Sequence, residues 1–366
     1  MHPAVRVEQL MATFGVLTGG GDCPGLNAVI RAVVRRGLLD GHSFVGFHGG
    51  WLGLRDDDAQ ELTLGNTAGL VTRGGTILGT SRTDPLAGGE QALEALQATI
   101  ARRRIDAVAV IGGDGTLGAA RELCRYGLPL VTIPKTIDND ISGTDFSVGF
   151  QTAVQIATDA IDRLHTTAES HNRVMVVEVM GRHAGWIATC SGLASGADVI
   201  LVPERPFEVR DVCEQLVRRH RSSRSFSIVV VAEGARFGDP ELQVTAPREP
   251  RFALDSRAGV ITHPRSAAAP GGVGFLLRDQ IEARTGFDTR VTILGHVQRG
   301  GTPVAFDRIL ATRFGVAATE AMLSGKSGCM VALHGAEVIL VDLAEALAVP
   351  KPLDPDLYET AAVFFG

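Results

Sequence analysis

Residues 106–120 read DAVAVIGGDGTLGAA, and they decide the fold because a continuous apolar run passes through glycines into a helical pattern. The run shows no alternation of polar and apolar residues, which is typical of a strand buried on both faces of a parallel sheet. The same pattern recurs in eight further runs: TFGVLTGG, LPLVTIP, RVMVVEVMG, DVILVPE, FSIVVVAEG, RVTILGH, CMVALHG and EVILVDL. These runs predict strands of mostly parallel sheets.

Helical patterns separate the predicted strands. They occupy residues 28–38, 91–103, 117–126, 151–167 and 210–221. Alternating strands and helices predict a doubly wound α/β fold, and a chain of 366 residues is long enough for two lobes. In such folds ligands bind beyond the carboxyl ends of the strands, so the residues that follow each strand are the candidates for function.

The composition argues against several classes of protein. A net charge of −6 disfavours nucleic acid as a partner, and no apolar run is long enough to span a membrane. The five cysteines are scattered, which indicates a reduced, cytoplasmic protein without disulfides or zinc. Residues 1–11 lack a secretory signal and are predicted to be an extension, with Met1 or Met11 as the native start. The proline-rich stretch 237–272 is predicted to be a surface loop or a hairpin.

Two glycine-rich loops follow predicted strands. In LTGGGDCPGLN, three glycines and Asp22 precede a helix, so the backbone can approach a phosphate closely; a tight turn would explain the pattern equally well. In IGGDGT, Asp114 stands beside the glycines and Thr116 opens a helix. A carboxylate beside an anion-binding loop suits Mg²⁺, although Asp114 as a helix cap is the alternative.

The stretch 129–143, PLVTIPKTIDNDISG, ends an apolar run in a lysine and two aspartates. On extended backbone Asp138 and Asp140 would share one side, so that one serves as general base and the other as metal ligand or orienter. The alternative is a turn rich in Asp and Asn. Because two other anion-type loops accompany this stretch, we favour the functional interpretation.

Basic residues follow two later strands. LGHVQRGGTP brings His296 and Arg299 together, with Arg290 upstream, and EVMGRHAGW adds another arginine beside glycine. Arginine and histidine suit a sugar phosphate through charge-assisted hydrogen bonds. Glu233 ends another strand in VVVAEG and is a candidate for binding a hydroxyl group or for capping a helix.

Seven motifs stand in the order seen in 6-phosphofructokinases, which this chain resembles from about Ala12 to its end, apart from 237–272. They are GGGDCPGLN, RGGTILGTSR, IGGDGT, PKTIDND, VEVMGRHAGW, VAEG and LGHVQRGG. The resemblance implies two Rossmann-like three-layer lobes with the active site in the cleft between them. It assigns 12–149 and about 297–347 to a larger lobe that binds the phosphoryl donor, and 150–296 with 348–366 to a smaller lobe that binds fructose 6-phosphate.

The resemblance also implies phosphorylation of fructose 6-phosphate at O1, with Asp138 as the base and Mg²⁺ on the donor phosphates. The implied catalytic residues are Asp138, Arg82, Thr136 and Lys135. The implied donor site comprises Gly20, Gly21, Arg82, Gly113, Asp114, Gly115 and Thr116, with Asp114 and also Asp140 as metal ligands. The implied sugar site comprises Thr136, Ile137, Asp138, Arg173, Met180, Gly181, Arg182, Glu233, Arg290, His296, Val297, Gln298 and Arg299. Arg173 and Arg290 resemble the pair that the family lends to a neighbouring subunit, which implies a homodimer or homotetramer with shared active sites.

The phosphoryl donor depends on two positions that disagree. Users of ATP in this family typically have glycine after GGD and before TIDND, whereas users of pyrophosphate have aspartate and lysine. This chain has Gly115 and Lys135. An aspartate at the first position would block the α-phosphate of ATP, so Gly115 favours ATP, and a reversible pyrophosphate-dependent enzyme is the alternative.

Two other interpretations are weaker. A kinase of NAD would share GGDGT but leave PKTIDND unexplained, and a non-catalytic homologue would be expected to lack Asp138 or Asp114. Arg31 and Arg35 match part of the family's effector site, or form an exposed face of a helix.

Overall fold

The structure, a computed structural model, describes residues 11–222, 225–239, 242 and 272–365. Its larger sheet has seven strands in the order β11-β10-β5-β4-β1-β2-β3. Neighbouring strands are parallel except at the two edges, where β10 pairs with β11 and β2 with β3 in antiparallel fashion. The strands are β1 (Thr13–Thr18), β2 (Ser43–Phe47), β3 (Ala59–Glu61), β4 (Ala107–Gly112), β5 (Leu130–Pro134), β10 (Cys329–His334) and β11 (Glu337–Asp342).

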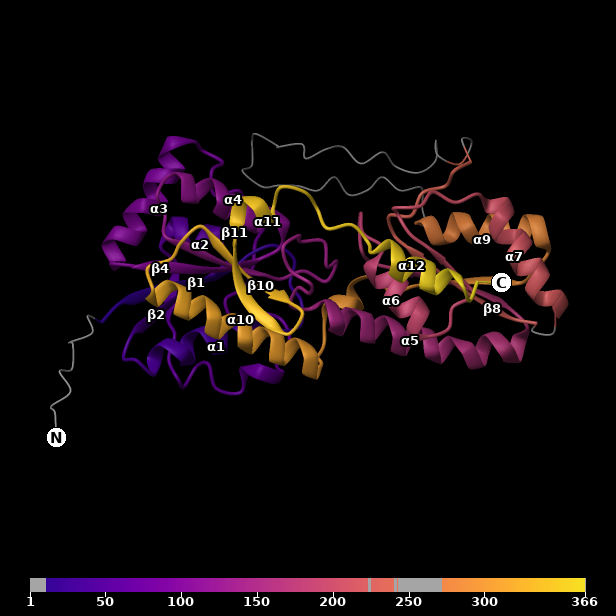
Figure 1. Ribbon diagram of the computed structural model, residues 1–366, viewed down its shortest axis with the longest axis horizontal. Coiled ribbons are helices and arrows are strands. Elements are labelled where there is room, and N and C mark those ends of the chain that lie inside the picture. Colours follow the sequence, from indigo (N-terminus) through magenta and orange to yellow (C-terminus); the bar gives the residue numbers. More distant parts are fainter. Residues whose placement is uncertain (1–10, 223–224, 240–241, 243–271, 366) are drawn as a thin grey trace.

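A second, smaller sheet has four parallel strands in the order β7-β8-β6-β9. They are β6 (Val174–Val179), β7 (Val199–Leu201), β8 (Ser227–Ala232) and β9 (Thr289–Ile293). Each sheet forms the middle of one lobe, and the two lobes lie end to end (Figure 1). Strands β4, β6 and β8 are buried along their whole length, as expected for strands covered on both faces.

Helices cover both faces of each sheet. In the larger lobe α1 and α10 pack together on one face, while α2, α3, α4 and α11 lie on the other (Figure 1). In the smaller lobe α5, α6 and α12 cover one face, and α7 and α9 the other. The helices are α1 (Leu26–Leu38), α2 (Trp51–Asp56), α3 (Glu90–Arg103), α4 (Asp114–Arg125), α5 (Phe150–His171), α6 (Trp186–Ala194), α7 (Val209–Ser222), α9 (Val273–Thr285), α10 (Ala305–Leu323), α11 (Leu343–Ala346) and α12 (Pro355–Ala362), with short 3₁₀ turns η1 (Leu70–Thr72) and η2 (Gly295–Arg299).

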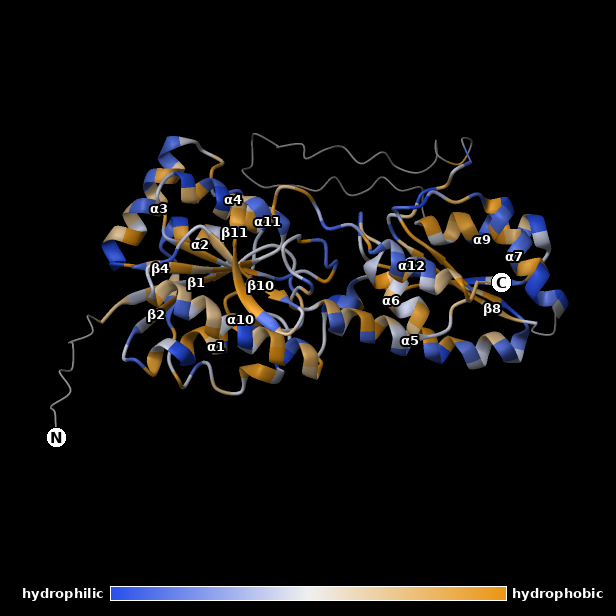
Figure 2. Ribbon diagram, in the orientation of Figure 1, coloured by the Kyte–Doolittle hydropathy of each residue, from blue (hydrophilic) through white to orange (hydrophobic). Residues whose placement is uncertain are grey.

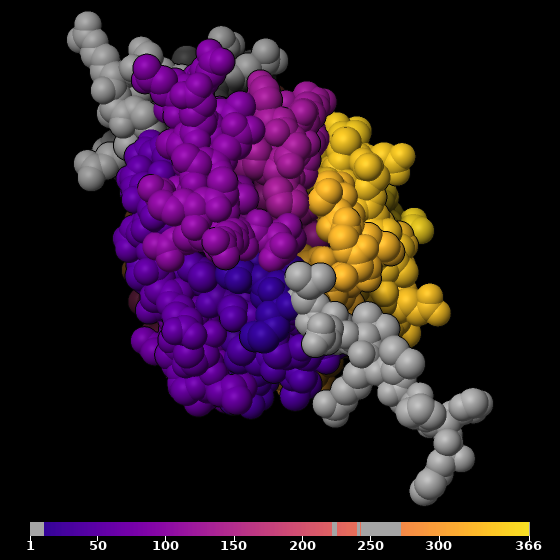
Figure 3. Space-filling model, turned by 90° about the vertical axis from the view of Figure 1, so that its left-hand side faces the viewer, coloured from indigo at the N-terminus to yellow at the C-terminus, as the bar shows by residue number. Residues whose placement is uncertain are grey.

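The apolar residues gather on the strands and on the helix faces that meet them (Figure 2). One core cluster runs through both lobes beneath α1, α10, α5 and α6, and two further clusters fill the opposite faces. Seen end-on, the larger lobe combines the first part of the chain with the late residues of α10, β10 and β11 (Figure 3). The chain then crosses to α12 on the smaller lobe (Figure 1).

The α/β fold expected from the sequence is confirmed, and all nine predicted runs contain strands. The five helical patterns correspond to α1, α3, α4, α5 and α7. Strands β2 and β3 were not predicted, because β2 follows α1 directly and β3 has only three residues. The run EVILVDL forms the antiparallel edge strand β11, and its apolar residues are half-buried rather than buried. The extension at 1–10 and most of 237–272 lie outside the described residues.

Candidate active site

Three loops meet at the carboxyl ends of the adjacent strands β1, β4 and β5. The Gly19 amide donates to Ile111 O at 2.9 Å, and the Lys135 amide donates to Gly112 O at 2.9 Å. Thr116 packs so closely against the first two loops that a Cβ at Gly19 or Gly112 would lie 2.6 or 2.4 Å from it. Side chains at these glycines would push the loops apart, so the sequence has to provide glycine there.

The first loop is held by a segment that the sequence analysis assigned only through Arg82. The Gly20 amide donates to Ser81 O at 3.0 Å, and Thr80 Oγ1 donates to Gly20 O at 2.6 Å. Gly20 has a φ of +80°, a conformation that glycine adopts without strain. Thr80 and Ser81 therefore set the position of this loop, a supporting role that their place in RGGTILGTSR did not reveal.

Lys135 follows β5 and is almost completely buried, with 2% of its surface exposed. Its ammonium group donates to Gly19 O at 3.2 Å and also to Gly21 O. Burial lowers the pKa of Lys135. The lysine therefore lies behind the first glycine loop and holds its carbonyl groups.

Asp114 and Gly115 begin α4 and are exposed, whereas Thr116 is buried. The N-cap of α4 is Gly113, so Asp114 does not occupy the capping position considered above. A Cβ at Gly115 would meet no heavy atom within 4 Å, which means that open space adjoins this residue. The start of α4 thus combines a free helix N-terminus with a carboxylate and room for a ligand.

The segment around Asp138 and Asp140 is a turn and not the extended strand end that the sequence analysis assumed. Asn139, between them, has a φ of +53° and is fully buried. Its side chain donates to Asp145 O at 3.2 Å and accepts from the Ser147 amide at 3.0 Å. The left-handed residue reverses the backbone locally, a conformation that asparagine tolerates better than most residues.

Asp138 is buried, Asp140 is half-buried, and the two carboxylates influence each other. Asp138 is 5% exposed, and both Asp138 Oδ1 and Asp140 Oδ1 are buried without a hydrogen-bond partner. Burial raises the pKa of Asp138, while the positive charges of Arg299 and Arg182 oppose that rise. Burial, followed by the charge of Asp138, raises the pKa of Asp140 to about 6. Unpartnered carboxylate oxygens of this kind are suited to accept a proton or to ligate a hard cation.

Three arginines from separate loops gather near one another, and the charges of two of them, Arg182 and Arg299, act on Asp138. The pKa of Arg82 is lowered by partial burial and then by the charges of Arg182 and Arg299. Arg299 also donates to Asp22 O at 3.4 Å and lies against Gly21, next to the first loop. Like charges gathered in one place favour an anionic ligand, because binding such a ligand relieves their repulsion.

The loops after β6 and β8 hold each other. Glu233 Oε1 accepts from the Arg182 amide at 3.1 Å, and the Glu233 amide donates to Val179 O at 2.8 Å. Gln298 is fully buried; its side chain accepts from the Met180 amide at 3.3 Å and donates to Gly295 O at 3.1 Å. Gln298 was expected to bind the sugar, but in the structure its side chain bonds the backbone of the Met180 loop and of η2.

Other predicted residues differ in their access to solvent. His296 and Val297 are exposed on η2. Thr136 is half-buried, and its hydroxyl accepts a hydrogen bond from the Asp138 amide at 3.1 Å. Ile137 is fully buried in the core, so its side chain is directed away from any ligand. Gly181, in the Met180 loop, has a φ of +140°.

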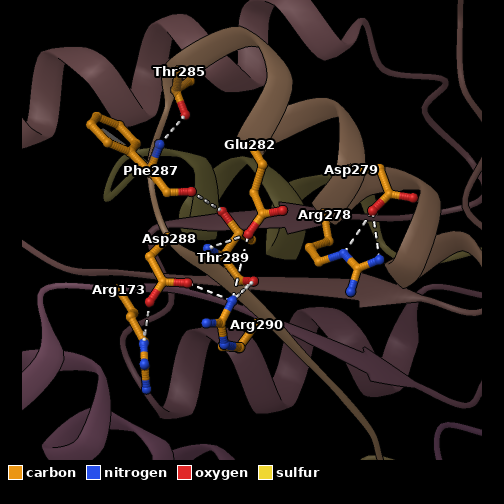
Figure 4. Close-up of polar contacts among 9 residues, drawn as sticks. All are labelled: Arg173, Arg278, Asp279, Glu282, Thr285, Phe287, Asp288, Thr289 and Arg290. Carbon is orange, nitrogen blue, oxygen red and sulfur yellow. Dashed lines mark hydrogen bonds and ion pairs between the residues drawn. The ribbon is translucent and has the colours of Figure 1, made fainter.

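Arg173 and Arg290 do not join the other predicted site residues. Arg173 precedes β6, and the six residues of this strand, about 20 Å, separate it from Met180 at the other end. Arg173 Nε lies 2.6 Å from Asp288 Oδ2, and Arg290 Nη1 lies 2.5 Å from Asp288 Oδ1 (Figure 4). The two arginines therefore form their own cluster with a partly exposed carboxylate at the amino ends of β6 and β9.

The described residues contain neither a membrane-spanning helix nor a cluster of metal-ligating side chains. No helix in this part of the chain is both long and apolar enough to cross a bilayer. Nor do three or more His, Cys, Asp or Glu side chains within it gather closely enough to hold a metal ion by themselves.

Comparisons with known proteins agree with this geometry. The sequence profile of the family described as Phosphofructokinase matches residues 13–322. A pyrophosphate–fructose 6-phosphate 1-phosphotransferase of Streptomyces coelicolor is 54% identical over 96% of this chain and 99% of its own length. ATP-dependent 6-phosphofructokinase 3 of the same organism is 48% identical over 95% and 98%.

The structural comparison leads to the same family. The phosphofructokinase of Pichia pastoris in the T-state superposes with a TM-score of 0.79 at 32% identity, covering 97% of this chain and 36% of that longer chain. The two-lobed architecture expected from the sequence is thereby confirmed, as is the expectation of an enzyme. The chain belongs to the phosphofructokinase family, in a group whose relatives are named for both ATP and pyrophosphate.

Proposed function

We propose that this enzyme transfers a phosphoryl group to O1 of fructose 6-phosphate, giving fructose 1,6-bisphosphate. The observation that carries the proposal is Asp138, a buried carboxylate with an unpartnered oxygen, close to the charges of Arg182 and Arg299. The carboxylate would accept the proton of the 1-hydroxyl while the hydroxyl oxygen forms a bond to the transferred phosphorus. The bond between that phosphorus and the oxygen of the donor's leaving phosphate would break at the same time. Arg82 would neutralise charge on the transferring group.

The family resemblance supports division of the binding work between the lobes. The larger lobe (12–149 and about 297–347) would bind the donor, with Gly20, Gly21 and the start of α4 around its phosphates. The smaller lobe (150–296 and 348–366) would hold the sugar phosphate through Arg182, Glu233, His296 and Arg299. Contacts of α12 with α6 and β7 support the assignment of the last residues to the smaller lobe.

Mg²⁺ fits the residues present. Asp140 has a buried oxygen without a partner and a pKa raised to about 6, and Asp114 is one of the charges that raise it. Asp114 and Asp140 would hold the ion, which would neutralise charge on the donor phosphates. A site with so few protein ligands suits Mg²⁺, because this ion is usually bound by one or two carboxylates together with substrate phosphates.

We propose ATP as the donor. The supporting observation is the open space beside Gly115, where a side chain would meet nothing within 4 Å. This space leaves room for the part of a nucleotide that extends beyond its transferred phosphate.

Pyrophosphate is the second candidate. Lys135 supports it, since its charge lies directly behind the first glycine loop. The relatives named for pyrophosphate are also 51–54% identical, compared with 45–49% for those named for ATP.

Initial rates with fructose 6-phosphate and Mg²⁺ distinguish the two donors when ATP and pyrophosphate are supplied separately. We expect turnover with ATP, and we expect Gly115→Asp to abolish it by placing a carboxylate in the open space. Turnover with pyrophosphate alone would show that Lys135 determines the donor. Absence of turnover with both donors, in protein shown to be folded, would contradict the proposed reaction.

A further inference from the structure

Lysine is rare in this chain: only three of the 35 lysine and arginine residues are lysines. Lys326 is exposed in the turn after α10. The other two place their ammonium groups on backbone carbonyls beside the candidate active site, Lys135 behind the first glycine loop and Lys351 behind the loop that follows Asp138. An ammonium group offers three compact donors, whereas the planar guanidinium of arginine suits carboxylates and phosphates.

Lys351 lies on the segment that crosses from the larger lobe to the smaller one. Its amide donates to Asp140 O at 2.9 Å. Its ammonium group donates to Thr144 O at 3.0 Å and to Asp145 O at 2.5 Å. One residue thus fastens the two ends of the turn that begins with the catalytic carboxylates.

The carbonyl groups that Lys351 holds belong to the network that fixes Asn139. Asp145 O also accepts from the Asn139 side chain at 3.2 Å. Asn139 has the left-handed backbone that directs its two neighbours, Asp138 and Asp140. A shift of the Asp145 carbonyl would therefore be transmitted through one side chain to both carboxylates.

The same ammonium group also faces the smaller lobe. It lies 4.8 Å from the centroid of the Trp186 ring, within the range of a cation–π interaction. Trp186 is the first residue of α6 and directly follows the loop that contains Met180 and Arg182. Lys351 thereby contacts Asp145 in the loop after Asp138 on one side and Trp186, at the start of α6, on the other.

A second contact holds the crossing segment to the same place. The Leu353 amide donates to Glu204 Oε1 at 3.2 Å, and the Gly185 amide donates to both oxygens of Glu204 at 3.0 and 3.1 Å. Ser142 Oγ donates to Val349 O at 2.6 Å on the other side. The backbone of 349–353 is therefore bonded directly to the loop after Asp138 and, through the Glu204 side chain, to Gly185. Lys351 adds a side chain that contacts both the loop after Asp138 and Trp186.

We propose that Lys351 is a positioning residue that couples the base loop (138–147) to the sugar loop (180–186) across the two lobes, an inference that rests on the proposed function. It touches neither substrate nor donor. Its effect is to keep Asp138 aligned with the hydroxyl of a sugar held by the other lobe. Misplacement by about 1 Å can cost on the order of 10²-fold in rate.

The test compares Lys351→Met, which keeps the length of the side chain and removes the ammonium group, with Lys326→Met as the matched control. Amide hydrogen exchange is measured first, because it does not require turnover. We expect faster exchange in both 138–147 and 180–186 for Lys351→Met, unchanged exchange in 106–120, and no change anywhere in those segments for the control. Unchanged exchange in either loop would overturn the coupling.

Kinetics then separate positioning from loss of folded protein. For Lys351→Met we expect kcat to fall about 10-fold and the KM for fructose 6-phosphate to rise, with an unchanged KM for the donor. A smaller folded fraction would lower the maximal rate alone and leave both KM values unchanged, which would contradict the proposal. Lys351→Arg, which restores the charge, should recover the KM for the sugar at least in part. If wild-type protein were inactive, the proposed function would fail while the exchange result would still decide the coupling.

Discussion

At the scale of single residues, some motif residues hold the backbone of the site rather than offering their side chains to a ligand. Asn139 places two carboxylates by adopting a left-handed conformation, and Gln298 bonds the Met180 amide with its side-chain oxygen. The sequence grouped Asp138, Arg182 and Arg299 because each comes after a strand, and in the structure the charges of both arginines act on Asp138. It did not identify Thr80 or Lys351 as supports, since their partners lie dozens to hundreds of residues away and no local pattern marks them.

The base assignment predicts the effect of Asp138→Asn. Asparagine keeps the size of the side chain but cannot accept the hydroxyl proton, so we expect kcat to fall about 10²-fold or more while fructose 6-phosphate still binds. Steady-state rates and calorimetric titration of the sugar phosphate measure the two effects. Asp159→Asn is the control, since Asp159 lies exposed on α5 and accepts from the Gln155 side chain of the same helix. Near-normal turnover of Asp138→Asn would remove Asp138 from the role of base.

At the scale of elements, the junction of the lobes depends on one carboxylate. Asp307, on α10, is fully buried and accepts from the amides of Gly149 and Thr152 at 3.0 and 2.7 Å and from the Thr152 hydroxyl at 2.5 Å. It thereby caps α5, which has no capping side chain of its own. The sequence predicted α5 from its apolar periodicity, but it could not reveal a cap supplied from more than 150 residues away.

Replacing this carboxylate should destabilise the fold strongly. Asp307→Ala leaves buried donors without an acceptor, each at a cost of about 1–3 kcal/mol. Asp342→Ala removes the cap of α11, which is an exposed side chain, and should cost only about 1 kcal/mol. Urea unfolding of both variants measures the difference. Equal shifts of the unfolding midpoint would show that α5 does not need Asp307.

At the scale of the whole molecule, Arg173 and Arg290 form a cluster with Asp288 apart from the other predicted site residues, and we propose that this cluster serves the site of a neighbouring chain. The guanidinium groups lie about 20 Å from the sugar loop, at the opposite ends of the strands, and Asp288 is partly exposed there. A symmetric oligomer can bring this cluster to the site of a neighbouring chain. The sequence led to the expectation of a shared site only through its resemblance to 6-phosphofructokinases. No pattern within one chain indicates which of its residues act on a neighbouring chain.

Sharing of the site between chains predicts complementation between inactive variants. Asp138→Asn retains both arginines, and the double variant Arg173→Ser with Arg290→Ser retains the base, so each alone should turn over slowly. In a mixed oligomer, some sites combine an intact base with arginines from the other chain. For random dimers we expect co-expression to restore about a quarter of the wild-type rate, since half of the dimers are mixed and each contains one complete site.

The control for complementation is Arg278→Ser, which removes an arginine that pairs with Asp279 near the same cluster (Figure 4). This variant should keep its activity and its oligomeric state, as measured by rates and by light scattering. If the double variant were as active as wild type, Arg173 and Arg290 would not serve any site. If the double variant were inactive and co-expression restored no activity, Arg173 and Arg290 would act within their own chain. Their distance from Met180 means that this would require a rearrangement of the smaller lobe that breaks their bonds to Asp288.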